Sequence, residues 1–148
     1  MKRHPALHSL SHDHHQGLIL AQQLKKHAPQ YKGMSSTPDG KKEYTISFYN
    51  TELKEHFENE EKILFPAVLG KDKNIDRMIL EIINEHRKME LYILDLQNPG
   101  EIEDTLDKLG MLLEQHIRKE ERELFPAIEN ILTESELSRL EIKLKKNK

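Results

Sequence analysis

HFENEEKILFPAV occupies residues 56–68, and HIRKEERELFPAI occupies residues 116–128, so nearly the same stretch occurs twice, sixty positions apart. Seven of the thirteen positions are identical and three more are conservative exchanges, which chance does not explain. In each copy a histidine precedes a glutamate by four residues, the spacing that places two side chains on one face of an α-helix. The repeat therefore predicts two equivalent helices that carry polar groups one turn apart.

Composition extends this prediction to the whole chain. A third of the 148 residues are charged, whereas Gly, Pro and aromatic residues are few, a balance that favours long helices. Apolar residues at helical spacing predict helices over about residues 6–27, 44–69, 74–96 and 101–132, with a surface loop at 30–43. Thr133-Glu134-Ser135-Glu136 predicts a capping box that opens a short fifth helix. Pro66 and Pro126 predict a matched bend in the two repeat copies.

These segments predict an all-α fold, an up-down-up-down four-helix bundle with a short C-terminal fifth helix. We expect a single domain over residues 1–148, with its core at about 7–130 and a C-terminal helix or solvated tail at 133–148. Phe65 and Phe125 are expected to plug one end of the core. The sequence does not determine the oligomeric state.

Charge and cysteine content narrow the partners and the kind of site. The formal net charge is −3, which does not favour nucleic acid or an anionic membrane as a partner. There is no cysteine, so any metal must be bound by nitrogen and oxygen atoms. No long apolar segment is present, and we expect a soluble, cytoplasmic protein without a membrane partner.

Each predicted helix carries a histidine on its apolar face, and three of these are followed by a glutamate four residues later. The residues are His14, His56, His86 and His116, with Glu60, Glu90 and Glu120. Burying so many polar groups could cost more than the roughly 5–15 kcal/mol that stabilises a domain. Divalent cations would offset that cost, and seven donors suit two metal ions rather than one. The mixture of imidazole and carboxylate fits iron, manganese or zinc.

The paired motifs, His56 to Pro66 and His116 to Pro126, together with His14 and His86, resemble the hemerythrin-like family, also called HHE cation-binding domains. The resemblance spans roughly residues 7–130. It implies a four-helix bundle that holds two iron ions with an oxo or hydroxo bridge, with zinc or manganese as alternatives. It also implies that O2, NO or peroxide is the small-molecule ligand.

The resemblance implies a ligand set with three open choices. His14 competes with His15, Glu121 competes with Glu120, and Glu90 stands where oxygen-carrying relatives have a histidine. Glu58 and Glu61 are expected to be solvated or to orient imidazoles. A site richer in carboxylates favours the ferric state, so we expect sensing, storage or redox turnover ahead of oxygen transport.

Three functions compete at this point. The first is a metal and small-molecule binding protein, possessing no dedicated catalytic residues, in iron homeostasis or the response to oxidative or nitrosative stress. The second is a redox enzyme that oxidises iron(II) or consumes peroxide at the same site. The third is iron storage, or a bundle in which zinc has only a structural role. We favour the binding protein over the dedicated enzyme.

Overall fold

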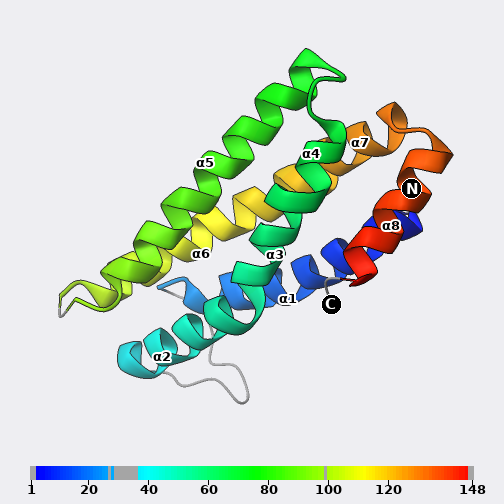
Figure 1. Cartoon of the computed structure of the whole chain (residues 1–148). Coiled ribbons are helices and arrows are strands. Elements are labelled where there is room, and N and C mark those ends of the chain that lie inside the picture. The colour runs from blue at the N-terminus through cyan, green and yellow to red at the C-terminus, as the bar shows by residue number, and fades with distance from the viewer. Residues whose placement is uncertain (1–2, 27, 29–36, 99, 147–148) are drawn as a thin grey trace.

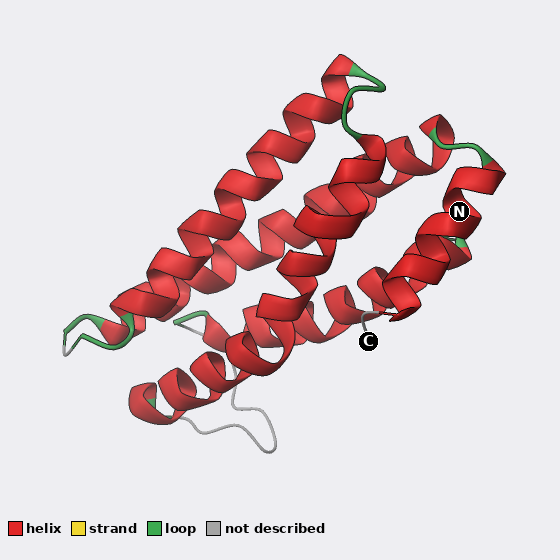
Figure 2. Cartoon of the chain, in the orientation of Figure 1, coloured by secondary structure: helices red, strands yellow, loops and turns green. Residues whose placement is uncertain are grey.

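The computed structural model describes residues 3–26, 28, 37–98 and 100–146, and within these ranges it is helical without a strand (Figures 1 and 2). The all-α prediction is confirmed. The α-helices are α1 (His8–Leu24), α2 (Pro38–Phe48), α3 (Lys54–Asn59), α4 (Phe65–Val68), α5 (Lys73–Asp95), α6 (Ile102–Lys119), α7 (Phe125–Ile131) and α8 (Glu134–Lys146).

Shorter helical segments join several of these helices end to end. A 3-10 turn, η1 (Pro5–Leu7), precedes α1. The π-helical segments η2 (Tyr49–Leu53), η3 (Glu60–Leu64) and η4 (Glu120–Leu124) connect α2 to α3, α3 to α4, and α6 to α7. The chain therefore forms a helical bundle in which α2 to α4 make one long rod, α6 and α7 make another, and α8 lies beside η1 (Figure 1).

The second rod begins earlier than the sequence predicted. Residues 38–43 were expected to belong to a loop, but α2 starts at Pro38, and that prediction is wrong. The Thr37 hydroxyl accepts a hydrogen bond from the Gly40 amide, and proline is well suited to the first helical position because its missing N–H has no partner there anyway. The rest of the expected loop, residues 30–36, and the expected end of the first helix at His27 lie outside the described residues.

The two prolines of the repeat each follow a π-helical segment. Proline has no N–H to donate and its ring crowds the carbonyl four residues earlier, so a regular α-helix cannot pass through it unchanged. Phe65 donates its amide to the Glu60 carbonyl, five residues back, and Phe125 does the same to Glu120. The matched irregularity thus takes the form of two widened turns, which begin at the glutamates of the motif.

The apolar core divides into two clusters with a polar layer between them. One cluster holds Phe65 and Phe125, as predicted, together with Leu137, Leu140 and Leu144 of α8. The other holds apolar residues from the second halves of α1 and α5 and from α6, together with Leu53 and Phe57. The apolar face of α8 is therefore part of the core, while its lysines, Lys143, Lys145 and Lys146, are exposed.

The capping box at the start of α8 is also confirmed. Thr133 donates its amide to the Glu136 carboxylate at 2.9 Å, and Glu136 donates its amide to the Thr133 hydroxyl at 3.1 Å. These two bonds satisfy backbone donors at the helix start and fix where α8 begins.

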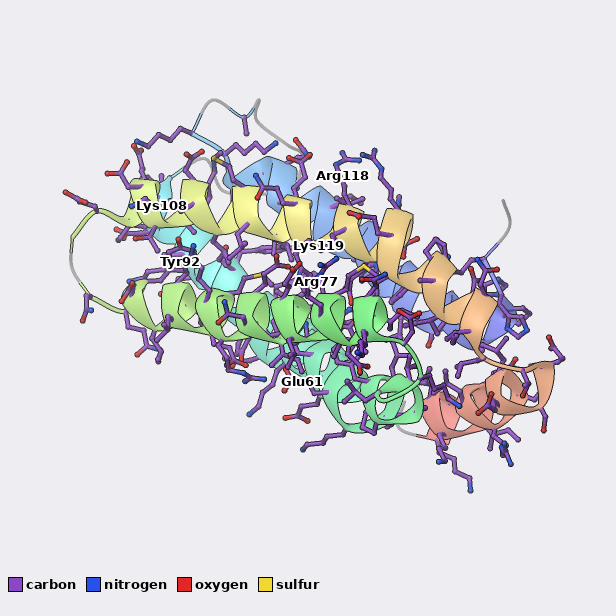
Figure 3. The ribbon with its side chains drawn as sticks, turned by 90° about the horizontal axis from the view of Figure 1, so that it is seen from above. Glu61, Arg77, Tyr92, Lys108, Arg118 and Lys119 are labelled. Carbon is purple, nitrogen blue, oxygen red and sulfur yellow. The ribbon has the colours of Figure 1, made fainter. Side chains whose placement is uncertain are left out.

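The outer surfaces of α5 and α6 carry charged side chains (Figure 3). Arg77, Lys108 and Arg118 are exposed. Among the described helices, none has both the length and the apolar composition to span a membrane.

Candidate metal centre

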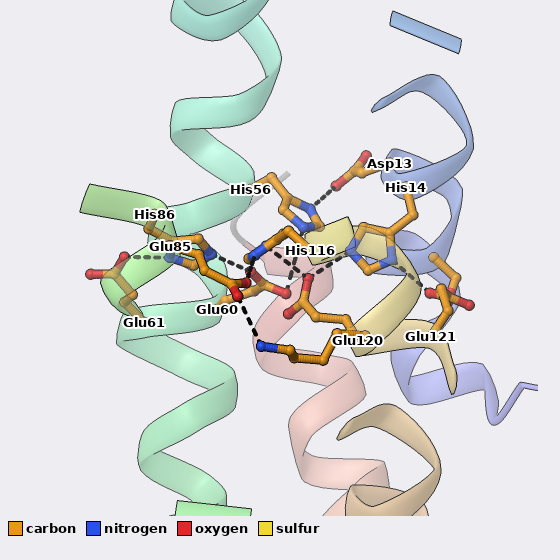
Figure 4. A network of polar contacts seen from close by, with 12 residues as sticks. Asp13, His14, His56, Glu60, Glu61, Glu85, His86, His116, Glu120 and Glu121 are labelled. Carbon is orange, nitrogen blue, oxygen red and sulfur yellow. Dashed lines mark hydrogen bonds and ion pairs between the residues drawn. The ribbon is translucent and has the colours of Figure 1, made fainter. Parts of the chain in front are cut away.

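Four imidazoles and two carboxylates meet in the polar layer between the two core clusters (Figure 4). Each of the six side chains is at most 3% exposed. They come from every long rod of the bundle and are His14 (α1), His56 (α3), Glu60 (η3), His86 (α5), His116 (α6) and Glu120 (η4).

The inner nitrogen of each imidazole, Nε2, faces a glutamate. Glu120 Oε1 lies 2.9 Å from His14 Nε2 and 3.2 Å from His116 Nε2. Glu60 Oε1 lies 3.0 Å from His86 Nε2, while its Oε2 lies 3.5 Å from His56 Nε2. Each glutamate thus stands between two imidazoles that come from different rods.

The outer nitrogen of each imidazole, Nδ1, is held by a carboxylate from another helix. Nδ1 of His14 lies 2.6 Å from Glu121, and Nδ1 of His86 lies 2.7 Å from Glu61. The other two pairs are His56 with Asp13 at 3.0 Å and His116 with Glu85 at 2.8 Å. Such carboxylate–imidazole pairs fix the tautomer and the ring direction of metal-binding histidines.

Three of these outer carboxylates also contact a cation. Arg87 contacts Glu61, Arg3 lies 3.3 Å from Glu121, and Lys119 lies 2.8 Å from Glu85. Burial by itself would raise the pKa of the three carboxyl groups, but the hydrogen bonds from His86, His116 and His14, with help from the cations, lower it. The three carboxylates are therefore ionised, and each accepts a hydrogen bond from the Nδ1–H of its histidine.

With Nδ1 as a donor, each neutral imidazole offers only a lone pair at Nε2, and that lone pair faces a carboxylate. Acceptors that face acceptors repel one another unless a cation or a proton lies between them. Within the described part of the chain, hydrogen-bond partners are lacking for four buried inner atoms: Nε2 of His56 and His116, and Oε2 of Glu60 and Glu120.

Without a cation, protons take that position. Burial lowers the pKa of His14, but hydrogen bonds to Glu120 and Glu121 outweigh it and raise the pKa to about 10. Burial likewise opposes the charge on His116, and the Glu120 carboxylate raises its pKa to about 9. The Glu120 carboxyl is itself held well below its usual pKa, although burial opposes this, because His116 stabilises its charge.

The six inner groups divide into two overlapping sets, each able to hold one ion. Donor atoms of His14, His56, Glu60 and Glu120 lie within 4.8 Å of one another, and so do those of Glu60, His86 and His116. Glu60 belongs to both sets, so it is placed to be shared. Imidazole nitrogen with carboxylate oxygen is a donor set that suits iron, manganese or zinc.

A comparison with protein families agrees with the metal-binding geometry of the site. Residues 5–128 match the family described as Hemerythrin HHE cation binding domain. The chain belongs to this family. Comparisons with curated proteins and with solved structures gave no match.

The HHE domain brings together six of the eight predicted site residues. Between the two candidates on α1, His14 is buried in the layer and His15 is exposed. Two predicted residues lie elsewhere. Glu121 contacts Nδ1 of His14 and the Ser11 hydroxyl, at 2.7 Å, rather than the inner layer. Glu90 turns to Arg87, at 2.7 Å, and accepts a hydrogen bond from the Tyr49 hydroxyl.

The sequence reasoning missed Asp13 and Glu85, which orient imidazoles of this HHE domain. Each directly precedes a layer histidine on its own helix and holds a histidine of another helix. In the same way Glu61 and Glu121 directly follow a layer glutamate. The acidic neighbours in Asp13-His14 and Glu85-His86 were therefore a readable signal, although their partners could not be read from it.

Proposed function

We propose that this HHE domain is a non-haem di-iron protein that binds or reacts with O2, NO or peroxide. One observation carries the proposal: six buried donors form two overlapping sets in which imidazole lone pairs face carboxylates. Two divalent or trivalent cations would satisfy both kinds of group at once. The absence of cysteine is compatible with the cytoplasmic location that is part of this proposal.

In this proposal His14, His56, Glu60 and Glu120 hold one ion, and His86 and His116 hold the other with Glu60 shared. An oxo or hydroxo bridge between the ions completes the centre, within a four-helix up-down-up-down arrangement to which α8 is added. Iron at this position would supply reversible one-electron chemistry and open coordination positions for a small ligand.

The protein's own residues prepare the site in two ways. Asp13, Glu61, Glu85 and Glu121 fix the direction of the four rings, so the donors need little reorganisation to meet a cation. Burial excludes water, since the six inner groups are almost without solvent contact. Phe57 stacks on His86 with ring centres 3.9 Å apart, which keeps that ring in place from the apolar side.

The donor set also bears on which function is favoured. It contains four imidazoles, because Glu90 stands at the position where oxygen carriers have a fifth histidine. Fewer imidazole donors than an oxygen carrier has favour ferric iron, so sensing, storage or redox turnover is proposed ahead of oxygen transport. A stable and reversible O2 adduct of the purified protein would contradict this part.

Metal loading tests the central proposal. The protein should take up two iron(II) ions per chain under anaerobic conditions and develop absorption from a bridged ferric pair after air is admitted. His56→Ala and His116→Ala should each lose metal, and His15→Ala is the matched control because His15 is exposed. Uptake of a single colourless zinc with no iron binding would refute the di-iron proposal and favour a structural metal.

A further inference from the structure

Two hollows share a lining residue on α1: an outer groove between α1 and the rod that begins with α2, and a small inner chamber among α1, that rod and α6. The outer groove, about 450 Å³, opens on the surface and is lined by residues that include His12, Asp13 and Gln16 of α1 and Ser47 and Thr51 across from them. The inner chamber, about 10 Å³, lies against the imidazoles of His14, His56 and His116.

The rest of the inner chamber is mostly apolar. Gly17, Phe57, Leu113 and Ile117 contribute to its wall. A cavity needs about 10–15 Å³ to hold one water molecule, so the inner chamber is at the lower limit for a single particle of that size. Its mostly apolar wall therefore favours an uncharged molecule over a charged one, and a diatomic molecule, which is larger than water, needs a small outward movement of the wall to enter.

Asp13 lines both hollows. Its carboxylate accepts a hydrogen bond from His56 Nδ1 at 3.0 Å, and its side chain is 21% exposed. Asp13 is thus part of the wall that the two hollows share, and we expect a rotation of its side chain to bring them into contact without moving a helix.

We propose that small uncharged ligands reach the metal centre from the outer groove past Asp13, and that Gly17 and Ile117 set the size of the chamber they enter. The purpose of this route rests on the proposed metal centre. The two hollows and Asp13, which lines both, do not depend on that proposal.

Gly17 sets the size because it has no side chain. A Cβ added there would lie 2.8 Å from the terminal Cδ1 of Ile117, too close for a normal contact. Gly17→Ala would therefore place a methyl group in the chamber and push the end of Ile117 aside. Ile117→Val removes that same Cδ1 atom, so the double variant should regain the lost space.

The route is tested by the rate at which NO binds to the iron(II)-loaded protein in stopped-flow measurements. Glu85→Ala is the matched control for Asp13→Ala, because Glu85 holds His116 as Asp13 holds His56, is 20% exposed, and lines neither hollow. Asp13→Ala should raise the association rate roughly five- to tenfold over that of the wild type. Equal changes in both variants, or no change in Asp13→Ala, would overturn the route.

If Asp13→Ala fails to load iron, Gln16→Trp replaces it. Gln16 lines the outer groove and has no place among the inner groups, so a bulky side chain there should slow NO binding while leaving metal content unchanged. Binding at the wild-type rate would count against the route.

The chamber is tested without iron. In the zinc-loaded or, if no metal binds, the metal-free protein, dissolved O2 under pressure should broaden the methyl NMR signals of Leu113 more than those of Ile79, which is equally buried but in the other core cluster. Gly17→Ala should abolish the difference, and Gly17→Ala with Ile117→Val should restore it. Equal broadening at Leu113 and Ile79 in the wild type would overturn the chamber. Failure to bind metal would refute the proposed function, but the comparison of Leu113 and Ile79 could still be interpreted.

Discussion

Glu121 Oε2 lies 2.6 Å from Nδ1 of His14, on the outer edge of that imidazole. The preceding residue, Glu120, lies 2.9 Å from Nε2 on the inner edge of the same ring. Two successive glutamates of η4 therefore hold opposite sides of one histidine, one from within the buried layer and one from its half-buried margin. We therefore propose that Glu120 binds metal and that Glu121 orients His14. Removing the charge of each glutamate in turn distinguishes the two roles.

Glu120→Gln and Glu121→Gln should affect metal binding unequally. Glu120→Gln removes a donor and should abolish binding of at least one ion. Glu121→Gln only weakens the orientation of His14 and should lower affinity about 10- to 100-fold. Competition with a chromophoric chelator measures both, and Glu90→Gln, which changes a residue outside the layer, should bind as the wild type does. A larger loss in Glu121→Gln than in Glu120→Gln would reverse the assignment.

The metal-free protein should lose stability as the pH rises. His14 and His116 have folded pKa values of about 10 and about 9, above the ordinary value of 6.5. Their charged pairs with Glu120 therefore stabilise the fold fully below about pH 6.5, and this contribution is lost as the pH rises through the folded values. Urea midpoints of chelator-treated protein at pH 6, 8 and 10 measure the decline, and His14→Gln should reduce it.

The metal-loaded protein should show the opposite trend between pH 5 and 7. An imidazole must lose its Nε2 proton before that nitrogen can coordinate, so metal affinity increases with pH. If the urea midpoints of the loaded protein decrease with rising pH as those of the metal-free protein do, protons rather than metals neutralise the layer.

Metal removal at pH 7.5 should lower the melting temperature. A ligand present at a thousand times its dissociation constant stabilises the folded state by about 4 kcal/mol, which corresponds to about 10 °C in a domain of this size. Calorimetry with and without chelator tests this. His56→Ala with His116→Ala supplies the control, since chelator should leave its melting temperature unchanged.

Leu140→Ala should destabilise the domain because α8 belongs to the core. Leu140 is 2% exposed, so its truncation should cost about 2–5 kcal/mol. Ile142 on the same helix is 57% exposed, and Ile142→Ala should stay within about 0.5 kcal/mol. Equal urea midpoints for the two variants would mean that α8 does not contribute to the core.

Two of the differences between the sequence prediction and the structure, the start of α2 and the position of Glu90, have a local and a non-local cause respectively. Pro38 and Gly40 suggested a loop, yet proline at the first helical position and a threonine cap before it are helix-starting features, so a closer reading of the same residues could have found α2. Glu90 is different. It follows His86 by four residues, as Glu60 follows His56, but Met89 takes the buried position on α5 instead.

The spacing of histidine and glutamate in the repeat was enough to predict the helical class and the core-facing position of Glu60 and Glu120, because helix periodicity is a local property of the chain. The full repeated motif carried the resemblance to the family. Only the tertiary structure decided that Asp13 holds His56, that Glu85 holds His116, and that Glu90 turns outward. Those outcomes depend on how each rod is rotated and shifted against its neighbours, and the packing of whole side-chain surfaces, rather than any single motif, sets that rotation.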